Sequence, residues 1–328
     1  MRVLVTGGAG FIGSNLVRAL NGRGEEDIVV VDDLSDSSKI HNLRDCRIAD
    51  YLDKDEYLEL VESGRAVKPA VIFHQGACSD TMEADGRFMM DSNYRYSRVL
   101  LDYSIEHGIP FIYASSASVY GSGRTFTEEP SSENALNVYA FSKLMFDRYV
   151  RQHISNAPRQ VVGLRYFNVY GPGESHKGRM ASVAYHFGRQ YRDDGQIRLF
   201  VGSGGYSDGE QERDFVRVED AAAVNLYFMD HPDVSGLFNV GTGRSRSFND
   251  VALAVINARE TRPYTLAGAR EAGKITYVAF PDGLREKYQS YTCADLSALR
   301  RAGYARDFVD VEDGVGDYMR RLLGDDGV

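Results

Sequence analysis

Hydrophobic residues in the first two-thirds of the chain gather in short runs that alternate with longer amphipathic stretches. This alternation is the βαβ rhythm of a parallel sheet, and the density of Val and Ile in the short runs is typical of strands buried on both faces. The strand patterns are Val3–Val5, Ile28–Val31, Ala70–Phe73, Pro110–Tyr113 and Val161–Leu164. The clearest helical patterns are Ser14–Asn21, Asn93–Glu106 and Tyr139–His153.

The pattern changes after Gly171-Pro172, where loops lengthen and strand patterns return at Gly236–Val240 and Lys274–Val278. The glycine-rich polar stretch Gly202–Gly209 predicts an exposed insertion. We therefore predict an α/β fold, a Rossmann-like doubly wound parallel sheet with a smaller mixed α/β substrate-binding cap. The NAD(P)-binding domain would comprise residues 1–170 with a re-entry near 213–240, and residues 171–328 would mainly form the cap.

Composition narrows the class of protein. Hydrophobic residues make up 43% of the chain, which is ordinary for a packed globular protein, and 38 basic against 47 acidic residues argue against a nucleic-acid partner. Cys46, Cys78 and Cys293 have neither a zinc-site nor a disulfide spacing, so no metal is expected. No signal-peptide pattern and no run of about 18 apolar residues is present, so we expect a cytoplasmic protein without a membrane partner.

A glycine-rich loop follows the first strand pattern and opens a helix, in the run Thr6-Gly7-Gly8-Ala9-Gly10-Phe11-Ile12-Gly13. Glycines at 7, 10 and 13 permit a tight turn, a close approach of pyrophosphate to backbone, and close packing of helix on strand. The helix N-terminus adds open N–H groups and a favourable dipole. This arrangement predicts a dinucleotide cofactor.

Two residues give opposite indications about which dinucleotide binds. Asp32 ends the second strand pattern, where an acidic side chain bonds the adenosine ribose and favours NAD. Lys39 stands seven residues later and could meet the additional phosphate of NADP, or it could be a solvated loop lysine. Both cofactors therefore remain open at this point.

A catalytic group is indicated by Tyr139 and Lys143, which lie at i and i+4 on one face of a predicted helix. A nearby ammonium favours the phenolate and makes tyrosine usable as a general base. Ser116 lies just past the end of a predicted parallel strand, where ligands bind in this architecture, and can hydrogen-bond the same substrate oxygen. Together they predict redox chemistry on a substrate hydroxyl.

At these residues the chain resembles a known group of enzymes. The motifs TGGAGFIG, SSASVYG, YAFSK, RYFNVYGP and ERDFVRVEDAA are similar to those of extended short-chain dehydrogenases/reductases, which act mainly on nucleotide sugars. Within that superfamily the chain resembles the family of ADP-L-glycero-D-manno-heptose 6-epimerases. The segments that carry this resemblance are HQGACSDT (74–81), MMDSNYRYS (89–97), RYFNVYGPGESHKGRMASVAYH (165–186), FNVGTGR (238–244) and FPDGLREKYQSYTCADLSALRRAGY (280–304).

The resemblance implies an isomerase with one tightly bound NADP per subunit, NAD being the alternative. The reaction would be redox epimerisation at carbon 6 of ADP-D-glycero-β-D-manno-heptose, giving the L-glycero epimer for the lipopolysaccharide inner core. The only other partner implied is a further copy of the chain, because the family forms homo-oligomers, pentamers among them.

The resemblance also assigns site residues. The catalytic residues would be Tyr139 and Lys177 as the two acid/base groups, with Ser116 and Lys143 supporting them. The cofactor would contact Gly7, Gly10, Phe11, Ile12, Gly13, Asp32, Asp33, Lys39, Lys54, Gln75, Gly76, Ala77, Cys78, Ser79, Asn93, Lys143, Val169 and Lys177. The substrate would contact Asn168, Arg179, His186, Phe200, Val201, Gly202, Ser203, Arg213 and Tyr288.

A second base agrees with the chemistry of epimerisation. Hydride must leave one face of the carbon and return to the other, so the sugar oxygen occupies two places that one phenol cannot easily serve. From the residues alone Lys177 is a solvated loop lysine, and Arg213 either binds a diphosphate or pairs with Glu212 or Asp214.

Three other functions compete with this interpretation. A UDP-sugar 4-epimerase shares the glycine loop, Ser116, Tyr139 and Lys143 but does not require Lys177 as a base. A nucleotide-sugar 4,6-dehydratase carries Asp-Glu after the active-site hydroxyl, where this chain has Ala117-Ser118. A non-catalytic NADP sensor would keep the glycine loop and lose the Tyr–Lys pair.

Overall fold

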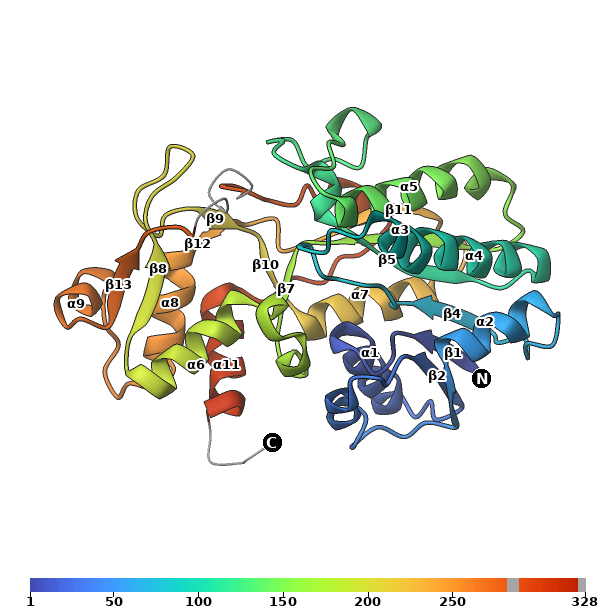
Figure 1. Cartoon of the computed structure of the whole chain (residues 1–328), viewed down its shortest axis with the longest axis horizontal. Coiled ribbons are helices and arrows are strands. Elements are labelled where there is room, and N and C mark those ends of the chain that lie inside the picture. Colours follow the sequence, from blue (N-terminus) through green and yellow to red (C-terminus); the bar gives the residue numbers. More distant parts are fainter. Residues whose placement is uncertain (282–288, 324–328) are drawn as a thin grey trace.

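The computed structural model describes residues 1–281 and 289–323 and is dominated by a seven-stranded parallel sheet (Figure 1). The spatial order of its strands is β11-β6-β5-β4-β1-β2-β3. In chain order the strands are β1 (Val3–Thr6), β2 (Ile28–Asp32), β3 (Asp50–Asp53), β4 (Val71–His74), β5 (Phe111–Ser116), β6 (Val161–Tyr166) and β11 (Gly236–Val240). The order reverses between β1 and β4, and a ligand crevice forms at such a point. The predicted fold class is confirmed.

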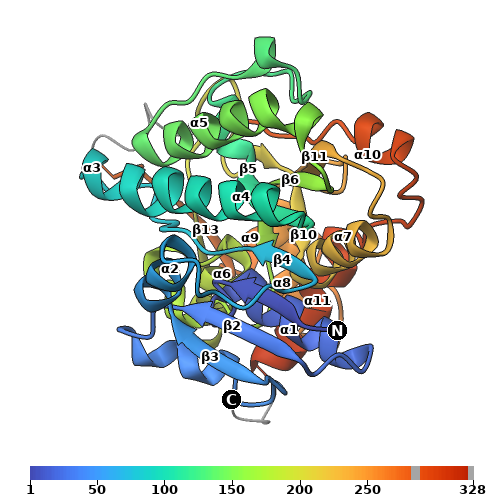
Figure 2. The ribbon, with the colours of Figure 1, turned by 90° about the vertical axis from the view of Figure 1, so that its right-hand side faces the viewer.

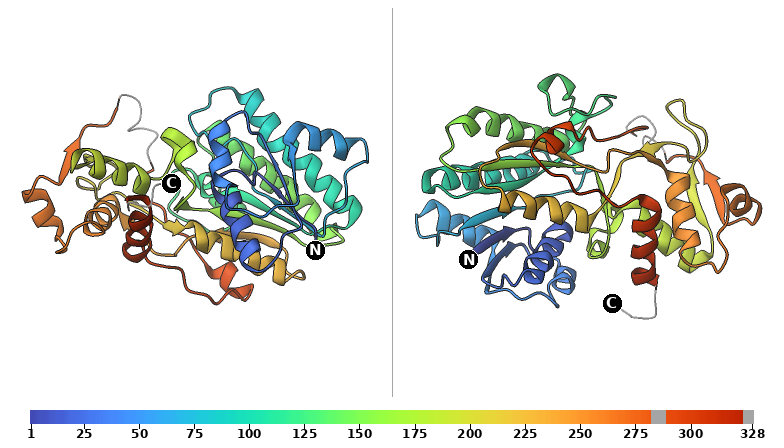
Figure 3. Two further views of the ribbon diagram at one scale, coloured as in Figure 1. Left: turned by 90° about the horizontal axis from the view of Figure 1, so that it is seen from below. Right: turned by 180° about the vertical axis from the view of Figure 1, so that it is seen from behind.

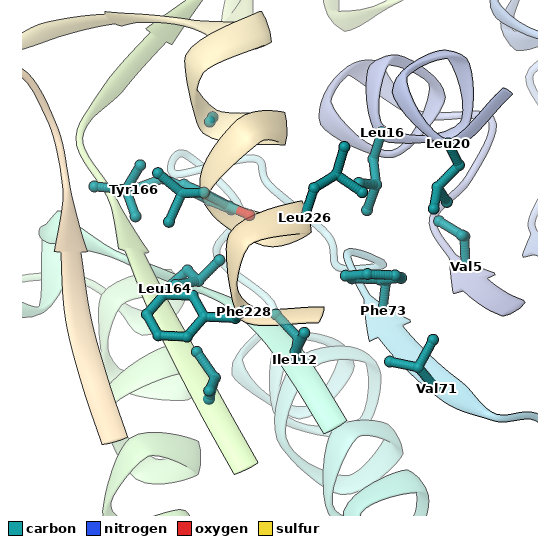
Figure 4. Packing of buried hydrophobic residues seen from close by; sticks show 14 of the residues in the cluster. Val5, Leu16, Leu20, Val71, Phe73, Ile112, Leu164, Tyr166, Leu226 and Phe228 are labelled. Atoms are coloured by element: carbon teal, nitrogen blue, oxygen red, sulfur yellow. The ribbon is translucent and has the colours of Figure 1, made fainter. Parts of the chain in front are cut away.

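Helices cover both faces of this sheet (Figure 2). On one face lie α1 (Phe11–Gly22), α7 (Val218–Asp230) and α10 (Ser297–Arg301), and on the other lie α2 (Lys54–Glu62), α4 (Tyr96–His107) and α5 (Val138–His153). Each buried Leu or Phe side chain contributes about 1.5–3 kcal/mol. The α1 and α7 face is held by Leu16, Leu20, Leu226 and Phe228, which pack onto Val5, Phe73, Ile112 and Leu164 (Figure 4). This packing fixes the first turn of α1 against the carboxyl ends of the strands.

Within the large sheet the hydrophobic pattern missed one strand, and it misplaced some helix starts. β3 has the polar sequence Asp-Tyr-Leu-Asp and lies at the edge of the sheet, where it pairs only with β2 and is partly exposed. An edge strand does not need a continuous apolar run, which is why no strand pattern appears there. The helix predicted to begin at Ser14 begins at Phe11, because Gly10 is its N-cap.

The smaller part of the chain has its own core, built on the parallel pair β8 (Ile197–Phe200) and β13 (Ile275–Val278). Its helices are α6 (Val183–Asp194), α8 (Phe248–Asn257), α9 (Leu266–Glu271) and α11 (Val311–Leu323). Figure 3 shows these elements together beside the large sheet. Two short ladders lie between the parts and consist of β7 (Asn168–Tyr170) with β10 (Phe215–Arg217), and β9 (Glu212–Arg213) with β12 (Arg246–Ser247).

The chain passes repeatedly between the two parts. After residue 171 it forms α6 and β8 in the cap, and then returns to the large sheet as α7 and β11. A later segment also belongs to the large domain. Its residues Leu299, Tyr304 and Phe308 pack in the same core as α1 and α7. The remaining short helices are α3 (Gly86–Met89), η1 (Ser37–Asn42), η2 (Met90–Arg95), η3 (Ala117–Tyr120), η4 (Pro130–Ser132), η5 (Ile154–Asn156) and η6 (Ser175–Met180).

Candidate active site

The glycine loop between β1 and α1 has no room for side chains at two positions. Gly7 has a φ of +66°, and a Cβ there would lie 2.5 Å from the backbone nitrogen of Gly76. A Cβ on Gly13 would lie 2.1 Å from the carbonyl oxygen of Gly7. Gly10 caps α1 without a side-chain hydrogen bond, and the first turn carries no acidic residue. The loop therefore suits an anionic ligand that approaches the backbone closely.

The end of β2 holds an ion pair. The Asp32 carboxylate accepts hydrogen bonds from the backbone N–H groups of Ala9 at 2.8 Å and Asp33 at 2.7 Å. The Lys39 ammonium donates to Asp32 at 3.0 Å and to the Asp33 carbonyl oxygen at 2.8 Å. Lys54 pairs with Asp55 at 2.9 Å. Acidic and basic side chains thus meet where the adenosine end of a dinucleotide is expected.

The loop after β4 is held from behind by Asn93. Its side chain is 0% exposed, donates to the Cys78 carbonyl oxygen at 2.9 Å and accepts from the Cys78 N–H at 2.8 Å. Asn93 lies in the π-helical turn η2, a form that occurs often at functional sites. Asn93 therefore holds the loop at Cys78 from the protein interior, and its own amide is not exposed at the surface.

Ser116 and Tyr139 meet at the end of β5. The Asn137 side chain accepts a hydrogen bond from the Ala140 N–H at 2.8 Å and thereby starts α5 just before the tyrosine. Burial raises the pKa of the Tyr139 phenol, and its hydrogen bond with the Ser116 hydroxyl opposes that rise. The phenol is therefore protonated near pH 7, and it can donate a proton.

Lys143 lies one helical turn after Tyr139 and is 5% exposed. Its ammonium donates to the carbonyl oxygen of Ala114 in β5 at 2.8 Å. Burial lowers the pKa of Lys143 to about 8, against the opposing charge of Asp147. The hydrogen bond to Ala114 fixes the lysine beneath the crevice.

Lys177 lines the same cavity from another element, the short helix η6 between β7 and α6. Its ammonium lies over the ring of Phe11, 5.4 Å from the ring centroid. Burial lowers the pKa of Lys177, and the charge of Glu174 partly opposes this. A lysine in these surroundings can lose a proton more readily than one in water.

Two adjoining cavities bring most of the predicted residues together. One cavity, of about 690 Å³, is lined by Ser116, Tyr139, Lys143 and Lys177 with the glycine loop, Gln75 through Ser79 and Val169. The other, of about 480 Å³, is lined by Asp33 and Lys54. The residues shared by both are Gly7, Asp32, Lys39, Gly76, Ala77 and Cys78. Every predicted cofactor residue except Asn93 therefore lines one cavity or the other.

The predicted substrate residues are less concentrated. Arg179 lines the larger cavity and pairs with Asp80 at 2.6 Å. The other described ones, which do not line that cavity, are Asn168, His186, Phe200, Val201, Gly202, Ser203 and Arg213. Arg213 is 6% exposed and donates to the carbonyl oxygens of Glu212 and Gln289. The predicted contact Tyr288 lies outside the described residues.

The sequence analysis missed a buried charge network around Asp147, one helical turn after Lys143 on α5. Asp147, which is 0% exposed, accepts from Tyr113 at 2.8 Å, from Ser115 at 2.9 Å and from Arg165 at 2.9 Å. Arg165 also pairs with Glu133 at 2.5 Å. A usable signal was the arginine inside the apolar strand Val161–Tyr166, since a buried guanidinium requires an acidic partner.

The described residues contain neither a metal-binding cluster nor a membrane-spanning helix. Within residues 1–281 and 289–323, no cluster of His, Cys, Asp and Glu has the arrangement needed to hold a metal ion. None of the helices in this part of the chain combines the length and the apolar character that crossing a membrane requires.

Comparison with known proteins agrees with this geometry. The sequence profile of the NAD dependent epimerase/dehydratase family matches residues 3–241. The chain is 58% identical to the ADP-L-glycero-D-manno-heptose-6-epimerase of Thiobacillus denitrificans, over 98% of this chain and 98% of that protein. It is 56% identical to the protein of the same name from Pseudomonas aeruginosa, over 98% of this chain and 99% of that one.

Two solved structures of epimerases are also similar to this chain. The ADP-L-glycero-D-manno-heptose-6-epimerase of Helicobacter pylori superposes with a TM-score of 0.81 at 30% identity, covering 98% of this chain and 96% of that one. The UDP-glucose 4-epimerase of Thermus thermophilus, solved with NAD, gives a TM-score of 0.79 at 26% identity, covering 99% and 100%. Because the profile spans most of the chain and the relatives span nearly all of it, the chain belongs to the NAD dependent epimerase/dehydratase family.

Proposed function

We propose that this protein interconverts ADP-D-glycero-β-D-manno-heptose and ADP-L-glycero-β-D-manno-heptose by oxidation and re-reduction at carbon 6. The observation that carries the proposal is that Tyr139, on α5, and Lys177, on η6, line the same cavity. The names of relatives at 56% and 58% identity support the same substrate. The product would serve lipopolysaccharide inner-core synthesis. The resemblance supports a homo-oligomer such as a pentamer.

The residues present fit a nicotinamide dinucleotide. Gly7 and Gly13 let the loop pack closely against Gly76 and against itself, and the uncapped N-terminus of α1 suits a pyrophosphate. When bound, the nicotinamide ring accepts a hydride from the sugar carbon and returns it. The adenosine end would lie in the smaller cavity beside Asp33 and Lys54.

The protein's own residues move the proton at the sugar oxygen. During oxidation one base takes the hydroxyl proton, and during reduction a protonated group returns one to the new alkoxide. The Tyr139 phenol performs one of these steps while the Ser116 hydroxyl orients the oxygen. Lys143 would supply a positive charge one helical turn from the phenol and would favour its phenolate form. Lys177 performs the second step for the epimer whose oxygen points toward η6.

Incubation with ADP-D-glycero-β-D-manno-heptose tests the proposal. NMR should show a mixture of both configurations at carbon 6, without net consumption of added cofactor. UDP-glucose, supplied in a parallel reaction, should remain unchanged. Conversion of UDP-glucose at carbon 4, with the heptose left unchanged, would instead support the UDP-sugar 4-epimerase function.

The purified protein is expected to carry a nicotinamide nucleotide without supplementation. A redox epimerase returns the hydride to the same molecule, so releasing the cofactor between half-reactions has no advantage. Mass spectrometry of the supernatant after denaturation measures the bound nucleotide. Gly13→Ala, which forces a Cβ to 2.1 Å from the Gly7 carbonyl oxygen, should lose it. A nucleotide-free preparation that is fully active without added cofactor would contradict the redox mechanism.

For the choice of cofactor we propose NADP. Both oxygens of the Asp32 carboxylate already accept hydrogen bonds, which leaves it less able to bind the ribose hydroxyls of NAD. An ammonium has three donors, and among the described residues Lys39 uses two, on Asp32 and Asp33. The third can bind a phosphate oxygen.

Lys39→Ala should therefore weaken NADP binding by about 1–3 kcal/mol, the cost of leaving a charged partner without its hydrogen bond. NAD binding should barely change. Titration calorimetry of the nucleotide-free protein with each cofactor measures both affinities. Lys68→Ala, at an exposed lysine that lines neither cavity, is the charge-matched control. Equal losses for both cofactors would mean that Lys39 does not contact the phosphate.

A further inference from the structure

The segment between β7 and α6, residues 171–182, is closed at both ends by one buried carboxylate. Glu174 is 1% exposed. It accepts hydrogen bonds from the Gly171 N–H at 3.2 Å and from the Ser182 hydroxyl at 2.8 Å. The backbone N–H of Ser182 also donates to it. A single side chain therefore joins the two ends of the loop that carries Lys177.

The loop is also fixed to both parts of the protein. On the large-domain side, Asn15 donates to the Pro172 carbonyl oxygen at 2.8 Å and Asn42 to that of Gly173 at 3.0 Å. On the cap side lies the buried Tyr318 of α11, whose phenol has its pKa raised by burial and by the charge of Glu174. The carboxylate thus sits at the point where the loop, the cap and the large domain meet.

Glu174 is linked to Lys177 through the turn itself and through its charge. The backbone N–H of Lys177 donates to the Glu174 carbonyl oxygen at 3.0 Å, which forms the first turn of η6. Burial lowers the pKa of Lys177, and the negative charge of Glu174 raises it. Burial raises the pKa of Glu174, and the positive charge of Lys177 is among the effects that lower it. Glu174 itself lines neither cavity, so it can affect the reaction only through the loop that it closes, in which Lys177 is the proposed acid/base group.

We propose that Glu174 is the positioning residue for Lys177: its buried carboxylate fixes the turn that brings the amine into the cavity and supplies the negative charge that balances it. This inference rests on the proposed epimerase function. Burying a carboxylate is costly unless it is hydrogen-bonded, and here donors from Gly171 and Ser182 satisfy it while the charge of Lys177 favours its ionised form. A loop needing only closure would not require a charge.

Other titratable groups line the cavity that Lys177 enters, and any test of Glu174 must leave these residues unchanged. On its own turn these are His176 and Arg179, and the groups on other elements that line the same cavity are Asp32, Asp36, Lys39, Cys78, Asp80, Tyr139, Lys143 and Tyr166. Burial and the charges of Lys39 and Lys177 lower the pKa of His176, so this imidazole is neutral near pH 7. Replacing Glu174 changes none of these residues.

The experiment compares Glu174→Gln with Glu174→Asp in the full-length, cofactor-loaded protein. Both disturb the fit of the side chain, but only the first removes the charge. The pH dependence of acylation of the Lys177 amine, followed by peptide mass spectrometry, reports its protonation without reference to activity. In Glu174→Gln the midpoint should fall by about one pH unit, because loss of a nearby negative charge disfavours the ammonium. In Glu174→Asp it should stay near that of the wild type.

Activity provides the second readout. In both variants kcat for epimerisation should fall by about tenfold or more with little change in KM, since a misplaced base slows chemistry but leaves substrate binding intact. Ser182→Ala removes one hydrogen bond to Glu174 and leaves its charge in place. It should lower kcat without changing the pH midpoint of Lys177 acylation. If Glu174→Gln does not fold, Ser182→Ala provides the test. An unchanged midpoint in folded Glu174→Gln, or wild-type kcat in Ser182→Ala, would overturn the inference. A wild-type protein inactive on the heptose would instead contradict the proposed function.

Discussion

Replacing Tyr139 with phenylalanine, or Lys177 with methionine, should each reduce epimerisation by about 10²–10⁴-fold, the contribution of a general acid–base group. The two side chains line one cavity from α5 and from η6. In the proposed mechanism each serves the sugar oxygen in one of its two positions. Epimerisation needs both positions and fails when either group is missing. The rate of appearance of the second epimer by NMR measures the loss.

The two variants should differ in the half-reaction that survives. A substrate analogue already at the aldehyde level at carbon 6 undergoes dismutation, in which one molecule is oxidised and another reduced. Each variant keeps one of the two groups and should retain part of this reaction, and one variant should retain more than the other. Separating the acid and alcohol products by chromatography measures this remaining activity.

Two other lysines serve as controls. Lys143→Met should impair epimerisation and dismutation together, because that ammonium lines the same cavity as Tyr139 and is hydrogen-bonded to Ala114. Lys68→Met, at an exposed position, should behave as the wild type. If Lys177→Met epimerises at nearly the wild-type rate with cofactor bound, the two-base mechanism is wrong and Tyr139 acts alone.

Asp147→Ala should lower the free energy of unfolding by about 3–5 kcal/mol, the usual cost of removing one partner from a buried ion pair. Its carboxylate is 0% exposed and accepts hydrogen bonds from Tyr113, Ser115 and Arg165. Without it, the two hydroxyls lose their acceptor, and Arg165 keeps Glu133 as its only acidic partner in the described part of the chain. Urea denaturation followed by circular dichroism, with the midpoint and slope fitted together, measures the change.

The matched control for Asp147 is an exposed carboxylate. Asp102 accepts a hydrogen bond from Tyr149 at 2.6 Å and lies 3.8 Å from Arg98, but its side chain is 46% exposed. Asp102→Ala should therefore change stability by about 0.5 kcal/mol or less. If Asp147→Ala were equally mild, the buried network would not be a major source of stability.

The fold was predictable because its signals are local. Strands buried on both faces require apolar runs, and the strands of the large sheet other than β3 carry such runs, as in Ile28–Asp32 and Val161–Tyr166. The edge strand Asp50–Asp53 carries no such run and was missed. The glycine loop was predictable for a similar reason, since a backbone turn without room for a Cβ allows only glycine at those positions.

The sequence by itself determined the sheet, the cofactor loop and the Tyr139–Lys143 pair, because these depend on spacing within one strand, turn or helix. Lys177 came only from the resemblance to a family, since in sequence it is one lysine in a loop. Tertiary structure decided the rest. The partners of Asp147, the closure of the Lys177 loop by Glu174 and the pairing of Lys39 with Asp32 join residues whose contacts no local pattern encodes. Burial makes those contacts necessary, and burial is known only once the chain has folded.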